Sequence, residues 1–166
     1  MRVLFVGRFQ PFHLGHLKAI EYISRVADFI IIGVGSSQEK NTLENPFSYK
    51  ERREMIERSL KIDKSRYSIV PIPDVGNDAL WVKSIIEMMP KFDVIYTNSP
   101  HEKKIFREAR LQVRNIPLFK RSHLNATEVR RKLSGGENWQ ELVPKETAAV
   151  IRKVDGVKRI VRLITS

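Results

Sequence analysis

Val3-Leu4-Phe5-Val6-Gly7-Arg8-Phe9-Gln10-Pro11-Phe12-His13-Leu14-Gly15-His16 is the stretch of sequence that decides the fold. Its first four residues have the unbroken apolar pattern of a buried strand, and a helix is predicted to begin at His13 or Leu14. Gly7 lets the backbone turn, and free amide groups are expected at the helix N-terminus, where Gly15 leaves room for a phosphate. His13 and His16 lie on one face, so both imidazoles are expected to donate to the same anion. The stretch therefore predicts a phosphate-binding turn.

Apolar runs and helical segments alternate along the chain. Strands are predicted at 3–6, 29–34, 67–72 and 94–97, with a weaker one at 113–117. Helices are predicted at 14–26, 49–60, 79–89 and 102–110. Short apolar strands separated by helices indicate a parallel sheet covered on both faces. We therefore expect a doubly wound, Rossmann-like α/β domain with a parallel five-stranded sheet, whose ligands bind beyond the carboxyl ends of the strands.

The end of the chain has a different character. Helical segments are predicted at 127–133, 139–142, 144–154 and 157–163. The chain has no internal repeat, low-complexity tract or Pro/Ser-rich linker, and with 166 residues it is long enough for one ordinary core. We therefore expect a single domain over 1–166, with an α/β core at 1–120 and a C-terminal helical subdomain at 121–166.

The charge balance limits the class of partner. The chain has 30 Lys and Arg residues against 19 Asp and Glu residues, and the formal net charge of +11 favours anionic partners. The basic blocks are short and are not interleaved with aromatic residues, so no nucleic-acid partner is expected. An apolar stretch of about 18 residues and a signal peptide are both missing, which predicts a cytoplasmic protein without a membrane partner. The absence of cysteine excludes thiolate catalysis and sulfur-bound zinc.

Two other interpretations of the histidine pair are open. Histidines three residues apart can ligate a metal ion, but His101 and His123 lie far along the chain without a recognisable ligand spacing, so no protein-bound metal is expected. The pair can also be polar residues that only cap a helix. The preceding strand and the sequence GRFQPF at 7–12 favour the phosphate site over both.

Asn125-Ala126-Thr127-Glu128-Val129-Arg130-Arg131 is a second candidate phosphate site. Asn125 and Glu128 have the spacing of a capping box, so a helix is expected to start here. Thr127 falls in its first turn, and Arg130 follows about one turn later on the same side. A hydroxyl and a guanidinium are thus added to a helix N-terminus, a combination that suits phosphate. Taken alone, the motif also fits an ordinary capped surface helix.

Gly33-Val34-Gly35-Ser36-Ser37-Gln38 has the superficial form of a dinucleotide-binding fingerprint. The third glycine is missing, and an irregular stretch rather than a clear helix follows. A hydride-transfer cofactor is therefore not expected at this loop.

Taken together, these motifs resemble the nucleotidyltransferase superfamily that is marked by the (H/T)xGH signature. The form GRFQPFHxGH at 7–16 is similar to that of archaeal-type nicotinamide mononucleotide (NMN) adenylyltransferases. The resemblance covers essentially the whole chain and includes SSQ at 36–38, ENPF at 44–47, ALW at 79–81 and TEVRR at 127–131. It implies an enzyme of NAD biosynthesis that transfers AMP from ATP to NMN by direct in-line attack, giving NAD and pyrophosphate.

The resemblance also implies roles for individual residues. Those expected to act in catalysis are His13, His16 and Arg130. Those expected to bind ATP or its phosphates are Gly7, Arg8, Phe9, Gly15, Asn98 and Thr127. Those expected to bind NMN are Ser36, Gln38, Asp74, Asn77 and Trp81. The resemblance implies that the Trp81 indole stacks on the nicotinamide ring, a cation–π attraction worth about 0.5 to 2 kcal/mol.

The chain departs from the family pattern at three places. Asp78 stands three residues before Trp81, where the family has asparagine, and Asn77 directly precedes Asp78. The contact with the carboxamide of NMN is therefore expected to be made differently in this chain. Thr97-Asn98-Ser99 differs in order from the usual YSGNP loop around the adenosine. Asn125-Ala126 replaces the usual small pair of the second phosphate motif, which changes side-chain contacts but not the helix N-terminus.

The resemblance further implies Mg²⁺ that accompanies ATP, and a homo-oligomer, in this family a homohexamer. A related transferase with another acceptor stays open, the acceptor being nicotinic acid mononucleotide, phosphopantetheine or FMN. Trp81 and the GRFQPF form argue against the last two, whereas the sequence does not separate the acid from the amide mononucleotide. A non-catalytic RNA-binding module is the alternative from another class, and only the net charge suggests it.

Overall fold

In the computed structural model, which describes residues 1–117 and 124–166, the first apolar run forms the central strand of the sheet. This strand, β1 (Arg2–Gly7), lies between β2 (Phe29–Val34) and β4 (Val94–Tyr96). The outer strands are β3 (Tyr67–Pro71) and β5 (Val113–Arg114), so the order is β3-β2-β1-β4-β5. Each strand pairs in parallel with its neighbours. The expected α/β fold with a parallel five-stranded sheet is confirmed.

The helices begin and end within two residues of the predicted bounds. They are α1 (Leu14–Val26), α2 (Tyr49–Ser59), α3 (Asp78–Met88), α4 (Pro100–Glu108), α5 (Ala126–Gly135), α6 (Lys145–Lys153) and α7 (Gly156–Thr165). Short 3₁₀ turns form at Lys64–Arg66 and Gln140–Leu142, the second of which is predicted as a helical segment. The weak fifth strand has two residues rather than the predicted five.

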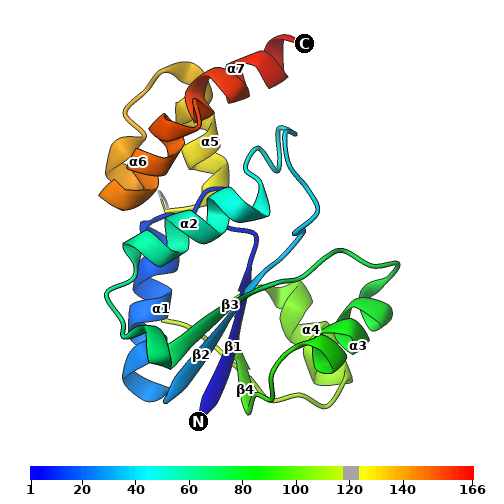
Figure 1. Ribbon diagram of the computed structural model, residues 1–166. Coiled ribbons are helices and arrows are strands. Elements are labelled where there is room, and N and C mark those ends of the chain that lie inside the picture. The colour runs from blue at the N-terminus through cyan, green and yellow to red at the C-terminus, as the bar shows by residue number, and fades with distance from the viewer. Residues whose placement is uncertain (118–123) are drawn as a thin grey trace. The chain divides into compact units, whose positions relative to one another are not determined.

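The described residues pack into two compact units, and the first contains the whole sheet. It consists of Met1–Gly7, Ala19–Ser36 and Ile62–Pro117. Helices α3 and α4 lie side by side on one face of the sheet (Figure 1), and the core of the unit lies between them and the strands. The buried residues of this core are Leu4, Ile31, Ile72, Val82, Ile85, Met89, Ile95, Ile105 and Phe106.

The second unit is mostly helical and consists of Arg8–Lys18, Ser37–Lys61 and the described part of Leu118–Ser166. Helix α2 packs against α6, and α7 packs against both α5 and α6. Gly136 follows α5 with φ 68°, a left-handed conformation that favours glycine at a helix C-terminus. The predicted boundary between a core and a helical subdomain, at residues 120 and 121, lies outside the described residues and stays a prediction.

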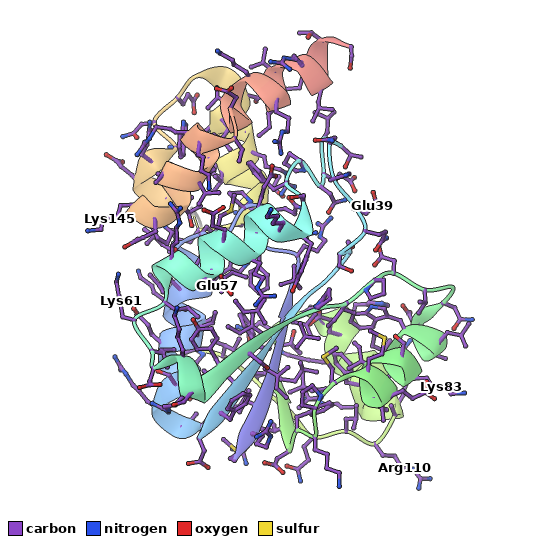
Figure 2. All side chains as sticks on the ribbon, viewed as in Figure 1. Glu39, Glu57, Lys61, Lys83, Arg110 and Lys145 are labelled. Carbon is purple, nitrogen blue, oxygen red and sulfur yellow. The ribbon has the colours of Figure 1, made fainter. Side chains whose placement is uncertain are left out.

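Charged side chains cover the surface of both units. Figure 2 shows Lys61, Lys83, Arg110 and Lys145 projecting outward, and all four are exposed. Ion pairs at such positions, like that between Lys83 and Glu87 at 3.8 Å, are worth about 0 to 1 kcal/mol each. None of the helices in the described ranges combines the length and the apolar character that a membrane crossing requires.

Candidate active site

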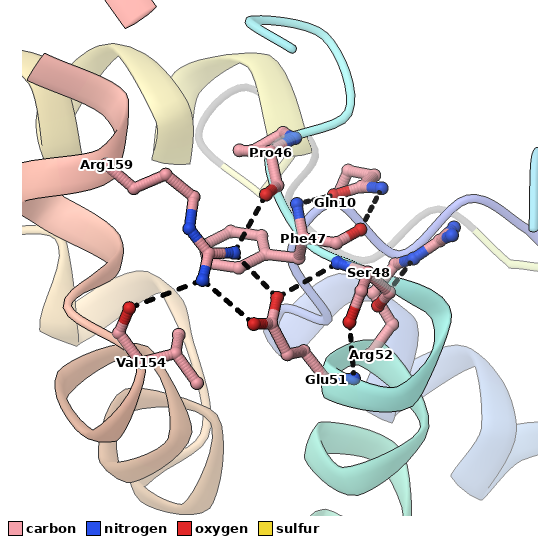
Figure 3. Close-up of polar contacts among 8 residues, drawn as sticks. All are labelled: Gln10, Pro46, Phe47, Ser48, Glu51, Arg52, Val154 and Arg159. Atoms are coloured by element: carbon pink, nitrogen blue, oxygen red, sulfur yellow. Dashed lines mark hydrogen bonds and ion pairs between the residues drawn. The ribbon is translucent and has the colours of Figure 1, made fainter. Parts of the chain in front are cut away.

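The loop that follows β1 is held by hydrogen bonds within the second unit. Gln10 is buried and donates from Nε2 to the Phe47 carbonyl oxygen at 2.8 Å, while its Oε1 accepts from the Phe47 amide at 2.9 Å (Figure 3). Phe9 has φ 53°, in the left-handed region, and its side chain is buried. A residue other than glycine in this region costs free energy, so the surrounding contacts have to hold it there. The loop is therefore a rigid support for the side chains that it carries.

Arg52 on α2 also fixes this loop, although the sequence analysis does not single it out. The side chain is completely buried and donates from Nη1 to the Arg8 carbonyl oxygen at 2.8 Å and from Nε to the Ser48 carbonyl oxygen at 3.2 Å. A buried guanidinium is tolerated only where such partners compensate for its lost hydration. A signal for it exists in the sequence, because Met55 and Ile56, three and four residues later, are buried on the same helix.

His13 and His16 stack on each other, with their ring centroids 3.6 Å apart and an interplanar angle of 25°. Nδ1 of His13 accepts from the amide groups of Gly15 at 3.0 Å and of His16 at 3.4 Å. Nδ1 of His16 in turn accepts from the His13 amide at 3.2 Å. A ring nitrogen that accepts a hydrogen bond carries no proton, so each neutral ring has its N–H at Nε2. Both histidines are thus set up as donors through the same ring nitrogen.

The start of α1 differs from the prediction in its use of the amide groups. The sequence predicts free amides for a phosphate, but the His13 ring accepts from those of Gly15 and His16. The reason why position 15 requires glycine also differs from the prediction. A Cβ there would lie 2.9 Å from Cε1 of His13 and 3.0 Å from the Leu124 carbonyl oxygen. Gly15 is therefore needed to seat the His13 ring. The helix-capping interpretation of His13 therefore applies, and the capping bonds orient its ring.

Aromatic rings enclose His16 on two further sides. Phe9 meets it edge-on at 4.7 Å between centroids, and Phe12 stacks on it at 5.6 Å. This burial lowers the pKa of His16 well below its ordinary value of 6.5, and the charge of a protonated His13 lowers it further. His16 is therefore neutral at pH 7 and acts as a hydrogen-bond donor rather than as a cation.

Two arginines meet at the same loop. Arg130 on α5 donates from Nη1 to the Gln10 carbonyl oxygen at 2.9 Å and from Nη2 to Thr127 Oγ1 at 3.5 Å. Burial lowers the pKa of Arg130, and the positive charge of Arg8 lowers it further, against an opposing effect of Glu44. Like charges held together repel each other, and a bound polyanion reverses that cost. The two arginines thus make the surroundings of this loop electropositive, with Arg130 reaching it from α5.

Helix α5 begins as the sequence predicts. Asn125 is its N-cap, and Oδ1 accepts from the Glu128 amide at 2.8 Å. The Glu128 carboxylate pairs with Arg131 at 2.8 Å, and Arg131 also reaches Glu137 at 2.8 Å. Of the two neighbouring arginines, Arg130 therefore faces the loop while Arg131 is engaged at the exposed surface.

The last helix is tied to the start of α2 by an ion pair. Ser48 and Glu51 form a capping box, and the Glu51 carboxylate also accepts two bonds from Arg159 on α7, at 2.7 and 2.9 Å (Figure 3). Arg159 donates as well to the Pro46 carbonyl oxygen at 3.0 Å, next to the residue that holds Gln10. The bonds from Arg159 and from the Ser48 amide hold the pKa of Glu51 below its usual range, although burial acts in the opposite direction. The segment before α2 is thus fixed from both sides.

A cavity of about 330 Å³ lies in the first unit at the start of α3. Its lining residues are Asp74, Val75, Gly76, Asn77, Asp78, Trp81, His101, Glu102 and Ile105. Trp81 is partly buried and packs against Phe106, with ring centroids 5.6 Å apart. Three of the residues predicted to bind NMN, namely Asp74, Asn77 and Trp81, thus share one cavity.

Among the polar side chains of this cavity, one caps a helix and two others contact each other. Asn77 Oδ1 caps α3 by accepting from the Leu80 amide at 3.0 Å. Asp78 Oδ1 lies 3.2 Å from Nε2 of His101 on α4. From the sequence Asp78 is only a departure from the family pattern and His101 has no predicted role, because no local spacing links residues that are 23 positions apart.

The other residues predicted to bind NMN or ATP lie in different parts of the structure. Ser36 donates from Oγ to Asp74 Oδ1 at 3.1 Å, so these two lie in contact. Gln38 is exposed and belongs to the second unit. Asn98 uses its amide group to bind both main-chain groups of Ile116, at 2.8 and 3.0 Å, so its side chain supports the segment after β5.

Gly7 is the last residue of β1, and its carbonyl oxygen accepts from the Gly35 amide at 2.8 Å. It therefore ends the central strand where the chain turns into the histidine loop. Within the described residues, no three His, Asp or Glu side chains gather as ligands of a metal ion would.

Comparison with known proteins finds relatives over the whole chain. The model of the cytidylyltransferase-like family matches residues 4–132. A nicotinamide-nucleotide adenylyltransferase of Thermococcus kodakarensis is 44% identical over 168 residues, which cover 99% of this chain and 89% of that protein. Another from Thermoplasma volcanium is 45% identical over 166 residues, covering 99% and 93% respectively.

A solved structure is similar as well. It is the crystal structure of a bifunctional NMN adenylyltransferase/ADP-ribose pyrophosphatase from Francisella tularensis, complexed with AMP and a manganese ion. The TM-score is 0.78 at 26% sequence identity, and the match covers 99% of this chain. It covers 52% of that protein, so the chain spans about half the length of this bifunctional relative.

Proposed function

The chain belongs to the cytidylyltransferase-like family and, within it, to the nicotinamide-nucleotide adenylyltransferases, and we propose from its site how it transfers AMP from ATP to NMN. The products are NAD and pyrophosphate. The observation that carries the proposal is that Arg8, His13 and His16 come from the loop after β1 and the start of α1, and that Arg130 binds the same loop from α5. Two guanidinium groups and two imidazole donors suit the charge and the oxygen atoms of a triphosphate.

The reaction needs alignment more than it needs a base. The phosphate oxygen of NMN forms a bond to the α-phosphorus of ATP, and the bond from that phosphorus to the bridging oxygen breaks. Pyrophosphate leaves with the electron pair of the broken bond. A phosphate monoester is already largely dianionic at neutral pH, so no side chain has to remove a proton first. The protein then contributes by positioning the groups and by neutralising the charge that develops on pyrophosphate.

We assign the ATP phosphates to the second unit. Arg8 and Arg130 supply charge there, Thr127 supplies a hydroxyl group, and His13 and His16 supply Nε2–H donors to the phosphates in the transition state. Gly7, Phe9 and Gly15 act indirectly, since they shape the loop and seat the His13 ring. We keep Asn98 as a residue near the adenosine, where its backbone rather than its side chain would make the contact.

We assign the nicotinamide end of NMN to the cavity of the first unit. Trp81 offers an indole face to the pyridinium ring, a cation–π contact that suits an electron-poor ring. We assign the ribose hydroxyl groups to Asp74 and Ser36, which bind each other. Asn77 shapes the cavity as the cap of α3, and Gln38, an exposed residue of the second unit, stays a predicted contact of NMN.

Three further properties belong to this proposal. Mg²⁺ enters with ATP, because phosphate oxygens and water commonly hold this ion without a cluster of protein carboxylates. The manganese ion bound with AMP in the Francisella tularensis relative supports a divalent cation. The family resemblance supports a homohexamer, and the role in NAD biosynthesis supports a location in the cytoplasm.

The test is an assay of the purified chain with ATP, Mg²⁺ and NMN, in which NAD and pyrophosphate are measured together and should appear in equal amounts. Arg130→Ala should lower kcat by about 10²- to 10³-fold, the usual effect of losing one transition-state donor. Arg131→Ala is the matched control, because this neighbour pairs with Glu128 and Glu137 at the surface. Turnover of FMN or phosphopantetheine without any NAD would overturn the proposal.

A further inference from the structure

The cavity beside Trp81 contains a carboxylate where the family pattern has an amide side chain. Asp78 is the first residue of α3 and lies three residues before Trp81, and both line the cavity. The neighbouring Asn77 already uses its Oδ1 to cap the helix, where it accepts from the Leu80 amide at 3.0 Å. Asp78 therefore places a carboxylate in the lining of the cavity that also contains the Trp81 ring.

An ionised carboxylate restricts which ligand group it accepts. It has acceptor oxygens only, whereas an asparagine side chain has both an acceptor oxygen and a donor NH₂ group. A carboxamide can donate its NH₂ to Asp78. The carboxylate of nicotinic acid mononucleotide has no proton to donate and carries the same charge as Asp78, so their contact is repulsive.

The rest of the lining does not offset this repulsion. Asp74 and Glu102 add two more acidic side chains to the same cavity. Burial raises the pKa of Glu102, although the bond from Thr97 Oγ1 at 2.5 Å acts in the opposite direction. The one basic side chain of the lining is His101, whose Nε2 already lies 3.2 Å from Asp78 Oδ1. His101 is thus engaged with the cavity's own carboxylate rather than with that of a ligand.

We propose that Asp78, held at one oxygen by His101, makes the chain select nicotinamide mononucleotide over nicotinic acid mononucleotide. This inference rests on the proposed function, in which the nicotinamide ring occupies the Trp81 cavity. Asp78 is a specificity-determining residue in this view, because it rejects the acid form of the substrate and accepts from the amide form.

The experiment measures kcat/KM for both mononucleotides with the wild-type chain and with Asp78→Asn. The wild-type chain should prefer NMN, and Asp78→Asn should lower the NMN-to-acid ratio at least about tenfold, corresponding to about 1.4 kcal/mol. Most of the change should come from a higher kcat/KM for the acid, because asparagine can turn its NH₂ group toward a carboxylate. Glu87→Gln is the matched control: it removes one negative charge from the same helix, outside the cavity, and should leave the ratio unchanged.

Calorimetric binding of the two mononucleotides gives a second readout that does not need turnover, and it should show the same change in preference. An unchanged ratio in Asp78→Asn, or a wild-type chain that uses both mononucleotides equally well, would overturn the inference while leaving the adenylyltransferase assignment intact. A wild-type chain that makes neither dinucleotide would overturn the proposed function itself.

Discussion

The two histidines of the loop have different surroundings, and these suggest different contributions to the reaction. The His13 ring accepts from two amide groups at the start of α1, so it closes the helix end as well as offering a donor. The His16 ring lies between aromatic neighbours, and burial keeps it neutral at pH 7. We therefore expect loss of His13 to disturb the local fold, whereas loss of His16 should mainly remove a donor.

His16→Ala should lower kcat by about 10²- to 10³-fold while changing the KM for NMN only a few-fold, because the lost donor acts on the phosphates in the transition state. Steady-state kinetics with both substrates checks this. His16→Gln is the informative companion, since its side-chain NH₂ group can replace the Nε2–H donor in part and should recover part of kcat. A loss that falls equally on kcat and on the affinity for NMN would contradict a transition-state role.

The sequence predicts part of this site because some contacts are local. The spacing of His13 and His16 and the cap at Asn125 follow from helix geometry within a few residues. The contact of Arg52 with the Arg8 carbonyl and the pair of Asp78 with His101 join distant segments, so no periodicity reveals them. The use of the first α1 amides is also mispredicted, because the side chain of His13 competes for groups that the backbone alone would leave open.

Among the elements, α2 and α7 are joined by a contact that both helices need. Glu51 completes the capping box of α2 and binds Arg159 through both carboxylate oxygens. Both side chains are mostly shielded from water, with 18% and 22% of the side-chain surface exposed. A bidentate, charge-assisted pair in such a setting is stronger than an exposed pair.

A double-mutant cycle with Glu51→Gln and Arg159→Met should therefore give a coupling free energy of about 1 to 3 kcal/mol, measured by urea unfolding. The control cycle uses Arg53 and Glu57 on the same helix, an exposed pair at 2.9 Å that should couple by about 0.3 to 0.5 kcal/mol. Equal coupling in the two cycles would show that shielding and geometry add nothing to the α2–α7 contact.

The elements themselves are predicted better than their connections. β1, β2 and α1 are recovered because each has a continuous apolar run or a clear helical period. β5 is predicted too long, because Val113 and Ile116 are apolar but only Val113–Arg114 pairs with β4. The sequence predicts a core followed by a C-terminal helical part, whereas each of the two observed units is assembled from three separate segments of the chain, which no local pattern indicates.

For the molecule as a whole, the basic side chains behind the net charge of +11 lie in two different environments. Many basic side chains are exposed, among them Lys61, Lys83 and Lys145 (Figure 2), and these are hydrated. Arg52 and Arg130 instead bind backbone carbonyl groups within the second unit, at the loop of the proposed phosphate site. The charge alone suggests an RNA-binding module, whereas the placement of these arginines supports a small polyanion.

The partly buried imidazole of His16 should make the stability of the whole molecule depend on pH. The pKa of His16 lies well below 6.5 in the folded chain, whereas in the unfolded chain it has the ordinary value. As the pH falls below 6.5, the unfolded chain therefore takes up a proton at His16 that the folded chain does not. The free energy of unfolding should decrease by up to about 1.4 kcal/mol per pH unit from this one group.

His16→Gln isolates this contribution because glutamine does not titrate. Urea unfolding of both chains between pH 7 and pH 5 should show a smaller loss of stability in the variant. Glu102 acts with the opposite sign, since burial raises its pKa and the folded chain then holds its proton to higher pH. That effect is present in both chains and cancels in the comparison. Parallel pH profiles would mean that His16 is protonated as easily in the folded chain as in the unfolded one, and a lowered pKa of His16 would then be wrong.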